Sequence, residues 1–224
     1  MNNTCYAYRA LYEKKGLIRF VSHLDVARMV MRALRLGVDE LNFSRGFNPH
    51  PKVSFCQALS LGFESDSEYF DFEALSRLDM GLLPGKINKN LPGGLKIVRV
   101  NGLERENSVG EPVSCSYAVE LERDPEYIAE CLDKFNSGET WVFRKENGRE
   151  INLRETVEEI KLFDKEDNRA GLFLKISLEN KKYVNPRAII CELFNYTEKD
   201  VLKFVFCRKH FDWRRKDAEN TNKC

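Results

Sequence analysis

A polar segment at residues 44–52, with the sequence SRGFNPHPK, carries most of the side chains that could contact a ligand. Two prolines flank His50 and stiffen the chain there, because proline fixes its own φ angle and restricts the residue before it. An imidazole titrates near neutral pH, so His50 could act as a general base or bind an anion. The segment predicts either a ligand-facing loop or a stiff turn in which His50 satisfies a backbone carbonyl.

A second polar motif, residues 22–25 with the sequence SHLD, is typical of a helix start. Ser22 suits the N-cap position, and Asp25 can reach back to the amide of the cap. The end of a first strand and the loop that enters a second can approach each other, so His23 and His50 can be neighbours in one cationic cleft. The candidate ligand-binding residues of that cleft are Arg19, Ser22, His23, Arg45, Phe47, Asn48, His50 and Lys52.

Three interpretations of these residues stay open. In the first, arginines bind phosphate oxygens, the helix N-terminus adds its dipole, and Phe47 stacks on a base. In the second, His23 or His50 deprotonates an RNA 2′-hydroxyl without a metal. In the third, both motifs are structural, one a cap and the other a turn.

Two further basic clusters admit a binding role. Arg28, Arg32 and Arg35 recur at spacings of four and three, which places them on one face of the expected helix. Charged residues on such a face are usually solvated. Near the C-terminus, residues 208–215 mix cations with aromatic side chains, which suits RNA, an acidic partner or a solubilising tail.

Composition limits the classes of protein to consider. Among 224 residues, 36 Lys and Arg nearly balance 35 Asp and Glu, so a nucleic-acid site must be local rather than global. The seven cysteines form no CxxC pair, which favours reduced core thiols over a metal site or disulfides. We expect neither a metal nor a cofactor. The sequence shows no signal peptide and no apolar run long enough for a membrane span, which predicts a cytoplasmic protein.

The predicted elements of the first half follow the order β-α-β-β-α-β, and the second half has a similar order with an additional strand. The first set comprises strands at 5–12 (extended or resumed at 17–21), 53–62, 68–73 and 95–100, with helices at 23–36 and 82–91. Gly37 would end the first helix, and residues 64–67 would form a turn. The second set comprises strands at 115–122, 141–145, 151–163, 172–178 and 202–207, with helices at 124–135 and 185–195.

We therefore predict an α+β protein of tandem ferredoxin-like (βαββαβ) units with antiparallel sheets, the second unit more decorated. The first domain would span 1–103, the second 112–213, and a flexible tail 214–224. The linker would lie in residues 101–111, which contain two glycines.

The motifs at 19–25 (RFVSHLD) and 43–55 (FSRGFNPHPKVSF) closely resemble the radical SAM-associated protein family, as do 58–65, 68–71 and 83–95. Its members are bacterial proteins encoded beside, or fused to, a cobalamin-binding-type radical SAM protein. The resemblance implies a radical SAM partner and an action on RNA or the translation apparatus, but no catalytic residue. Arg45 departs from the polar, uncharged residue typical of the family and adds positive charge.

The leading hypothesis is a non-catalytic accessory subunit of a radical SAM enzyme that binds RNA or presents a substrate through the cationic cleft. The tandem ferredoxin-like order also resembles RAMP-type endoribonucleases, so one alternative is a metal-independent RNA-cleaving enzyme that uses His23 or His50. Another alternative is a protein–protein adaptor that binds no nucleic acid.

Overall fold

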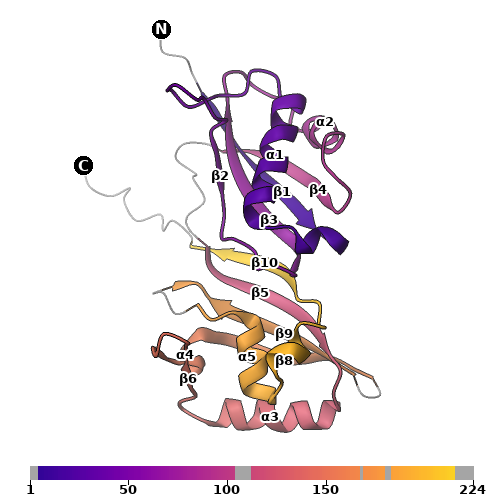
Figure 1. The fold of residues 1–224 in the computed structure, drawn as a ribbon, viewed down its shortest axis with the longest axis vertical. Helices are drawn as coiled ribbons and strands as arrows, with labels where there is room; N and C mark the ends of the chain where they lie inside the picture. Colours follow the sequence, from indigo (N-terminus) through magenta and orange to yellow (C-terminus); the bar gives the residue numbers. More distant parts are fainter. Residues whose placement is uncertain (1–4, 104–111, 167–168, 180–182, 215–224) are drawn as a thin grey trace, which may run out of the picture. The chain divides into compact units, whose positions relative to one another are not determined.

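The computed structural model describes residues 5–103, 112–166, 169–179 and 183–214. The chain divides into two compact units, residues 1–108 and 109–224. Each combines antiparallel strands with short helices, so the α+β class is confirmed (Figure 1). Residues 104–111 of the linker expected at 101–111, and the tail from residue 215 onward, lie outside the described residues, whereas residues 101–103 belong to the last strand of unit 1.

Unit 1 is built from four strands, two α-helices and one 3-10 helix. These elements are β1 (Tyr6–Lys14), η1 (Gly16–Phe20), α1 (His23–Gly37), β2 (Val53–Phe55), β3 (Glu64–Ala74), α2 (Leu83–Asn88) and β4 (Leu95–Leu103). All strand pairs are antiparallel and give the order β4-β1-β3-β2. Both helices pack their apolar sides on one face of this sheet (Figure 1).

Three local expectations for unit 1 were wrong. Residues 17–21 do not resume β1 but form η1, because the buried Lys14 ammonium donates to the carbonyl of Val21 at 2.9 Å and curls the chain. The strand expected at 53–62 ends at Phe55, and the expected turn at 64–67 belongs to β3. The turn lies earlier, where the Gly62 amide donates to the Arg19 carbonyl at 2.8 Å.

Gly37 has a different role from the one expected. It is the last residue of α1 rather than a stop signal beyond it. A β-carbon at this position would lie 3.0 Å from the Lys86 carbonyl oxygen and 3.1 Å from the Cα of Ile87. The glycine therefore permits α1 and α2 to approach closely.

Unit 2 has a similar order of main strands with more insertions. Its elements are β5 (Pro112–Leu121), α3 (Pro125–Ser137), β6 (Val142–Arg144), β7 (Glu150–Asn152), α4 (Leu153–Thr156), β8 (Val157–Glu166), β9 (Arg169–Ser177), α5 (Pro186–Phe194), α6 (Glu198–Val201) and β10 (Cys207–Trp213). The antiparallel order is β10-β5-β9-β8, and β6 with β7 forms a separate hairpin.

Two strand predictions in unit 2 were wrong. The strand expected at 151–163 is interrupted by α4, which Asn152 caps by accepting from the Arg154 amide at 3.1 Å. The last strand lies at 207–213 rather than 202–207. Thr197 and Asp200 form a capping box that starts the short helix α6, and this helix displaces the strand along the chain.

Candidate nucleic-acid interface

The SHLD motif forms a tightly bonded first turn of α1. The Ser22 hydroxyl accepts from the Asp25 amide at 3.2 Å and donates to the Asp25 carboxylate at 2.7 Å. That carboxylate also accepts from Arg28 at 2.7 Å. The bond from Ser22, followed by that from Arg28, lowers the pKa of Asp25 below its ordinary value. The cap is as predicted, but Asp25 binds the cap hydroxyl instead of the cap amide.

His23 and Arg19, the two predicted ligand-binding residues that lie near Ser22, also have partners. His23 meets the ring of Phe55 edge-on, with ring centroids 5.6 Å apart. Arg19 donates to the Glu64 carboxylate at 3.3 Å, and the same oxygen accepts from the Gly16 amide at 2.9 Å. The charge of Arg19 is therefore offset locally by Glu64.

The 44–52 segment forms a loop that is closed at its base. Phe43 pairs with Pro51 as an antiparallel bridge. The Ser44 amide donates to the His50 carbonyl at 2.7 Å, and the Ser44 hydroxyl accepts from the His50 amide at 3.0 Å. Gly46 adopts a φ of +142°, which suits a residue without a β-carbon. These bonds hold the loop in a defined shape.

The side chains of this loop point into solvent. Phe47 is 102% exposed, and Arg45, Asn48, Pro49 and His50 are also exposed. Lys52 differs, because its ammonium forms an ion pair with Glu73 at 3.0 Å. The same Glu73 oxygen accepts from Asn42 at 2.7 Å, so Lys52 belongs to a polar network at the base of the loop.

The arginine face of α1 is continuous with this loop. The guanidinium of Arg35 lies over the Phe43 ring, 5.8 Å from its centroid, directly before the loop begins. Arg32 is exposed one turn earlier on the helix. We call the set Arg32, Arg35, Arg45, Phe47 and His50 the α1–loop surface.

The structure separates the two predicted histidines. His23 is the first residue of α1 and contacts Phe55 at the end of β2. His50 precedes β2, and its carbonyl accepts from the amide of Ser44, the residue after Phe43. Phe43 in turn contacts Arg35 in the C-terminal turn of α1. Four residues lie between His50 and Phe55 in the chain, which gives five steps of about 3.3 Å each where the backbone is extended. The single cleft with both histidines is therefore wrong, and the eight candidates fall into two groups at opposite ends of α1.

The C-terminal basic cluster is largely part of the sheet of unit 2. Arg208 on β10 is fully buried and donates from two guanidinium nitrogens to the Tyr117 hydroxyl, at 3.0 and 3.2 Å. Arg214 pairs with Glu179, and His210 is exposed. Arg215 lies outside the described residues. The burial of Arg208 and its bonds to Tyr117 show that it has a structural role in the core.

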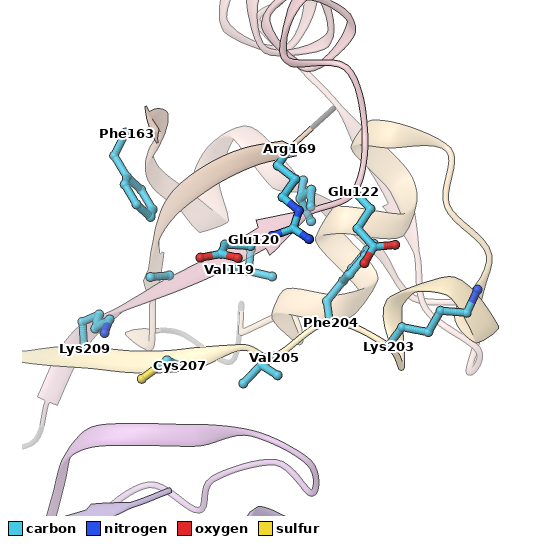
Figure 2. Close-up of a pocket in the computed structure, with 12 residues that line it drawn as sticks. Val119, Glu120, Glu122, Phe163, Arg169, Lys203, Phe204, Val205, Cys207 and Lys209 are labelled. Atoms are coloured by element: carbon cyan, nitrogen blue, oxygen red, sulfur yellow. The ribbon is translucent and has the colours of Figure 1, made fainter. Parts of the chain in front are cut away.

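The sequence did not single out a cavity of about 590 Å³ in unit 2 (Figure 2). Its walls come from β5, β8, β9 and the segment that enters β10. Residues more than 80 positions apart in the chain meet there, and no local motif indicates them. Periodicity could only have placed Phe163 in a strand.

Across the described residues, no three His, Cys, Asp or Glu side chains gather as a metal site. None of the helices in that part of the chain is long and apolar enough to cross a membrane.

Residues 7–186 match the model of a family described as an uncharacterized protein conserved in bacteria, DUF2344. The chain belongs to this family. A search of the curated proteins found no match.

Among solved structures, the chain is similar to an H/ACA RNP bound to a substrate RNA containing 2′-deoxyuridine. The identity is 10% and the TM-score 0.47, over 92% of this chain and 47% of that one. A Cbf5-Nop10-Gar1 complex matches at 10% identity and a TM-score of 0.48, over 90% and 48% of the two chains. The present chain thus spans about half the length of these matched chains. A likeness of this size does not extend to function.

Proposed function

We propose that this chain is a non-catalytic RNA-binding subunit that acts through the α1–loop surface. The observation that carries the proposal is Phe47, fully exposed at the tip of a closed loop beside Arg45 and the arginine face of α1. Aromatic side chains next to cations bind single-stranded nucleic acid, because each base can stack and each phosphate can pair. A loop already held in shape loses little conformational entropy on binding.

The charges around this surface favour an anionic ligand. In the described part of the chain, no carboxylate lies within ion-pair distance of Arg32 or Arg45. The neighbouring cations Arg28, Lys52 and Lys86 are each paired, with Asp25, Glu73 and Asp39. Arg32 and Arg45 can therefore pair with phosphate without competing with an existing ion pair, and the same holds for Arg35, whose printed contact is with the Phe43 ring.

We also propose that both units are ferredoxin-like. The orders β4-β1-β3-β2 and β10-β5-β9-β8 each correspond to a βαββαβ unit, if β6, β7, α4 and α6 are taken as insertions. This arrangement serves many unrelated functions, so it supports the RNA proposal only by analogy.

A radical SAM protein remains the proposed partner, on the strength of the resemblance at 19–25 and 43–55 alone. Co-purification of the two proteins after nuclease treatment is the expected result. Loss of the partner on nuclease treatment would indicate that RNA bridges them. If no association occurs either before or after treatment, this partnership is wrong.

The geometry does not favour the endoribonuclease alternative. An acid–base pair must lie within hydrogen-bond reach of the same reacting group. His23 and His50 lie at opposite ends of α1, and His23 packs on Phe55. Incubation of the protein with total RNA in EDTA tests the endoribonuclease alternative directly. That alternative predicts cleavage that is lost in His50→Ala, and we expect no such cleavage.

The RNA proposal is tested by the salt dependence of binding to a single-stranded oligoribonucleotide, measured by fluorescence anisotropy. Each phosphate contact contributes about 0.7 to the slope of log K against log salt. The double variant Arg32→Ala/Arg45→Ala should therefore flatten the slope by about 1.4. The matched control, Arg28→Ala/Lys86→Ala, removes two positive charges from the same unit, but from side chains that have carboxylate partners.

The control should change the slope far less than the Arg32 and Arg45 variant does. Phe47→Ala should weaken binding without changing the slope, because stacking involves no counterion. Absence of binding at low salt, or an equal effect of the two double variants, would show that the α1–loop surface does not bind RNA.

A further inference from the structure

The cavity in unit 2 has the size and lining of a small-molecule site. Its volume of about 590 Å³ falls in the range of roughly 300–1,000 Å³ typical of ligand pockets. Every residue that lines it belongs to unit 2. The charged lining residues are Glu120, Glu122, Arg169, Lys203 and Lys209, and the apolar walls include Phe163, Phe204 and Val205.

Phe163 provides an open aromatic face at one end of this cavity (Figure 2). A β-carbon at Gly171 would lie 2.9 Å from two ring atoms of Phe163, so the ring rests on the backbone of β9 where no side chain intervenes. Although one side of the ring is packed in this way, Phe163 is still 58% exposed. The ring is thus a supported platform on which a planar group can stack.

Charged groups line the rest of the cavity. Arg169 extends its guanidinium toward the carboxylates of Glu120 and Glu122 (Figure 2). Among the side chains that the structure describes, which exclude those of residues 165–168, no carboxylate lies within ion-pair distance of Arg169, so its guanidinium keeps donors for an anion. Lys203 lies at the other end from Phe163 and is 3.6 Å from Asp200. With Lys209, three cations and two carboxylates give a net charge of +1.

We propose that this cavity binds a nucleoside monophosphate, either free or as one residue of an RNA strand. The base stacks on Phe163, because base–aromatic stacking accepts any base. Arg169 pairs with the phosphate, since a guanidinium matches phosphate oxygens in a bidentate geometry. Glu120 and Glu122 accept from ribose hydroxyls or exocyclic amines, which are donors that a carboxylate recognises.

The combination of lining groups selects this ligand over simpler ones. Inorganic phosphate would use the cations but leave Phe163 and both carboxylates without contacts. An apolar ligand would bury the charged side chains without replacing their bonds to water, which is costly. A nucleotide has the planar ring, the donors and the anionic phosphate that together match the whole lining; the phosphate carries a charge of roughly −2 in the free monoester and one negative charge within a strand.

Calorimetric titration of the full chain tests the proposal, with the four nucleoside 5′-monophosphates, ribose 5-phosphate and a short oligoribonucleotide as probes. Arg169→Ala and Phe163→Ala should each weaken nucleotide binding by about tenfold or more. The control Arg149→Ala removes an exposed arginine from the β6–β7 turn of the same unit and should leave the affinity unchanged. Ribose 5-phosphate, which lacks a base, should bind at least about tenfold more weakly than the best nucleotide.

The inference does not rest on the proposed function, and the two can fail separately. Arg32→Ala/Arg45→Ala leaves the cavity intact, so mononucleotide binding should persist in that variant. Oligonucleotide binding alone, still dependent on Arg169 and Phe163, would identify a nucleotide within a strand as the ligand. The proposal is overturned if none of the probes binds at millimolar concentration. It is also overturned if ribose 5-phosphate binds as tightly as the nucleotides, or if Phe163→Ala leaves the affinity for nucleotides unchanged.

Discussion

Arg35 lies over the ring of Phe43, with 5.8 Å between the guanidinium carbon and the ring centroid. This contact joins the last turn of α1 to the residue that begins the 43–51 bridge. The arginine face of α1 is thereby continuous with an exposed loop. On its own, such a face would be an ordinary solvated helix surface. The arrangement gives Arg35 two possible contributions: fixing the loop and attracting phosphate.

Arg35→Lys and Arg35→Ala separate these contributions. Both variants remove the guanidinium that lies over Phe43, but Lys keeps the charge. If Arg35 acts mainly through charge, Arg35→Lys should bind RNA nearly as well as the wild type, whereas Arg35→Ala should reduce the salt slope by about 0.7. Equal losses of affinity in both variants, with the slope unchanged, would instead assign Arg35 to holding the loop.

Helix starts were the most predictable features of this fold. Ser22 was expected to cap a helix, and two further helices were expected to begin at Asp124 and Asn185; each of these residues accepts from a backbone amide in the first turn. Such caps depend on residues two or three positions apart, so the local sequence suffices. The α+β class likewise followed from the order in which predicted strands and helices succeed one another along the chain.

Features that depend on distant residues could not be read in this way. The curl at η1 depends on the burial of Lys14, and the role of Gly37 depends on Ile87, which is 50 positions away. The site shows the same limit. The polar segment was predicted as a loop, but only the contacts of His23 with Phe55, and of Phe43 with Pro51 and Arg35, place the two histidines near different ends of α1.

Gly37→Ala should destabilise unit 1. The added methyl group would lie 3.0 Å from the Lys86 carbonyl oxygen, and that backbone would have to shift. Overpacking of this kind costs about 1–3 kcal/mol of the free energy of unfolding. Gly85→Ala on α2 is the matched control, because its methyl group would meet nothing within 4 Å.

Gly85→Ala should be neutral or stabilise by about 0.5–1 kcal/mol, the usual gain from replacing a helix glycine with alanine. Urea denaturation of both variants measures the difference. If the two substitutions have the same effect, the close approach of α1 and α2 is not what Gly37 provides.

Ser22→Ala should weaken the start of α1. It removes the acceptor of the Asp25 amide, and loss of an N-cap typically costs about 0.5–2 kcal/mol. The same change removes the hydroxyl that donates to Asp25, so the pKa of Asp25 should rise toward its ordinary value. Titration of Asp25 by NMR measures this shift, and Ser22→Thr should restore both properties. If Ser22→Ala has the free energy of unfolding of the wild type and Asp25 keeps its wild-type pKa, Ser22 does not act as the cap.

We expect unit 2 to lose stability in acid because of the interactions of the Asp212 carboxylate. Its carboxylate accepts from Lys175 at 2.8 Å and from the Ser114 hydroxyl at 2.7 Å. The bond from Lys175 is the main cause of a pKa below the ordinary value for Asp212. Because the folded pKa is lower than the unfolded one, the stabilisation is present above about pH 4 and is lost as the pH falls through the lowered value.

Asp212→Asn should therefore unfold more easily than the wild type at pH 6, and this difference should shrink as the pH approaches 2.5. Urea midpoints measured across that range give the comparison. Asp133→Asn, an exposed position on α3, controls for the general effect of removing a carboxylate. Because Lys175 also pairs with Glu158 at 3.2 Å, some of its interaction survives in Asp212→Asn. A difference between the wild type and Asp212→Asn that stays constant with pH would mean that Asp212 contributes through packing rather than through its charge.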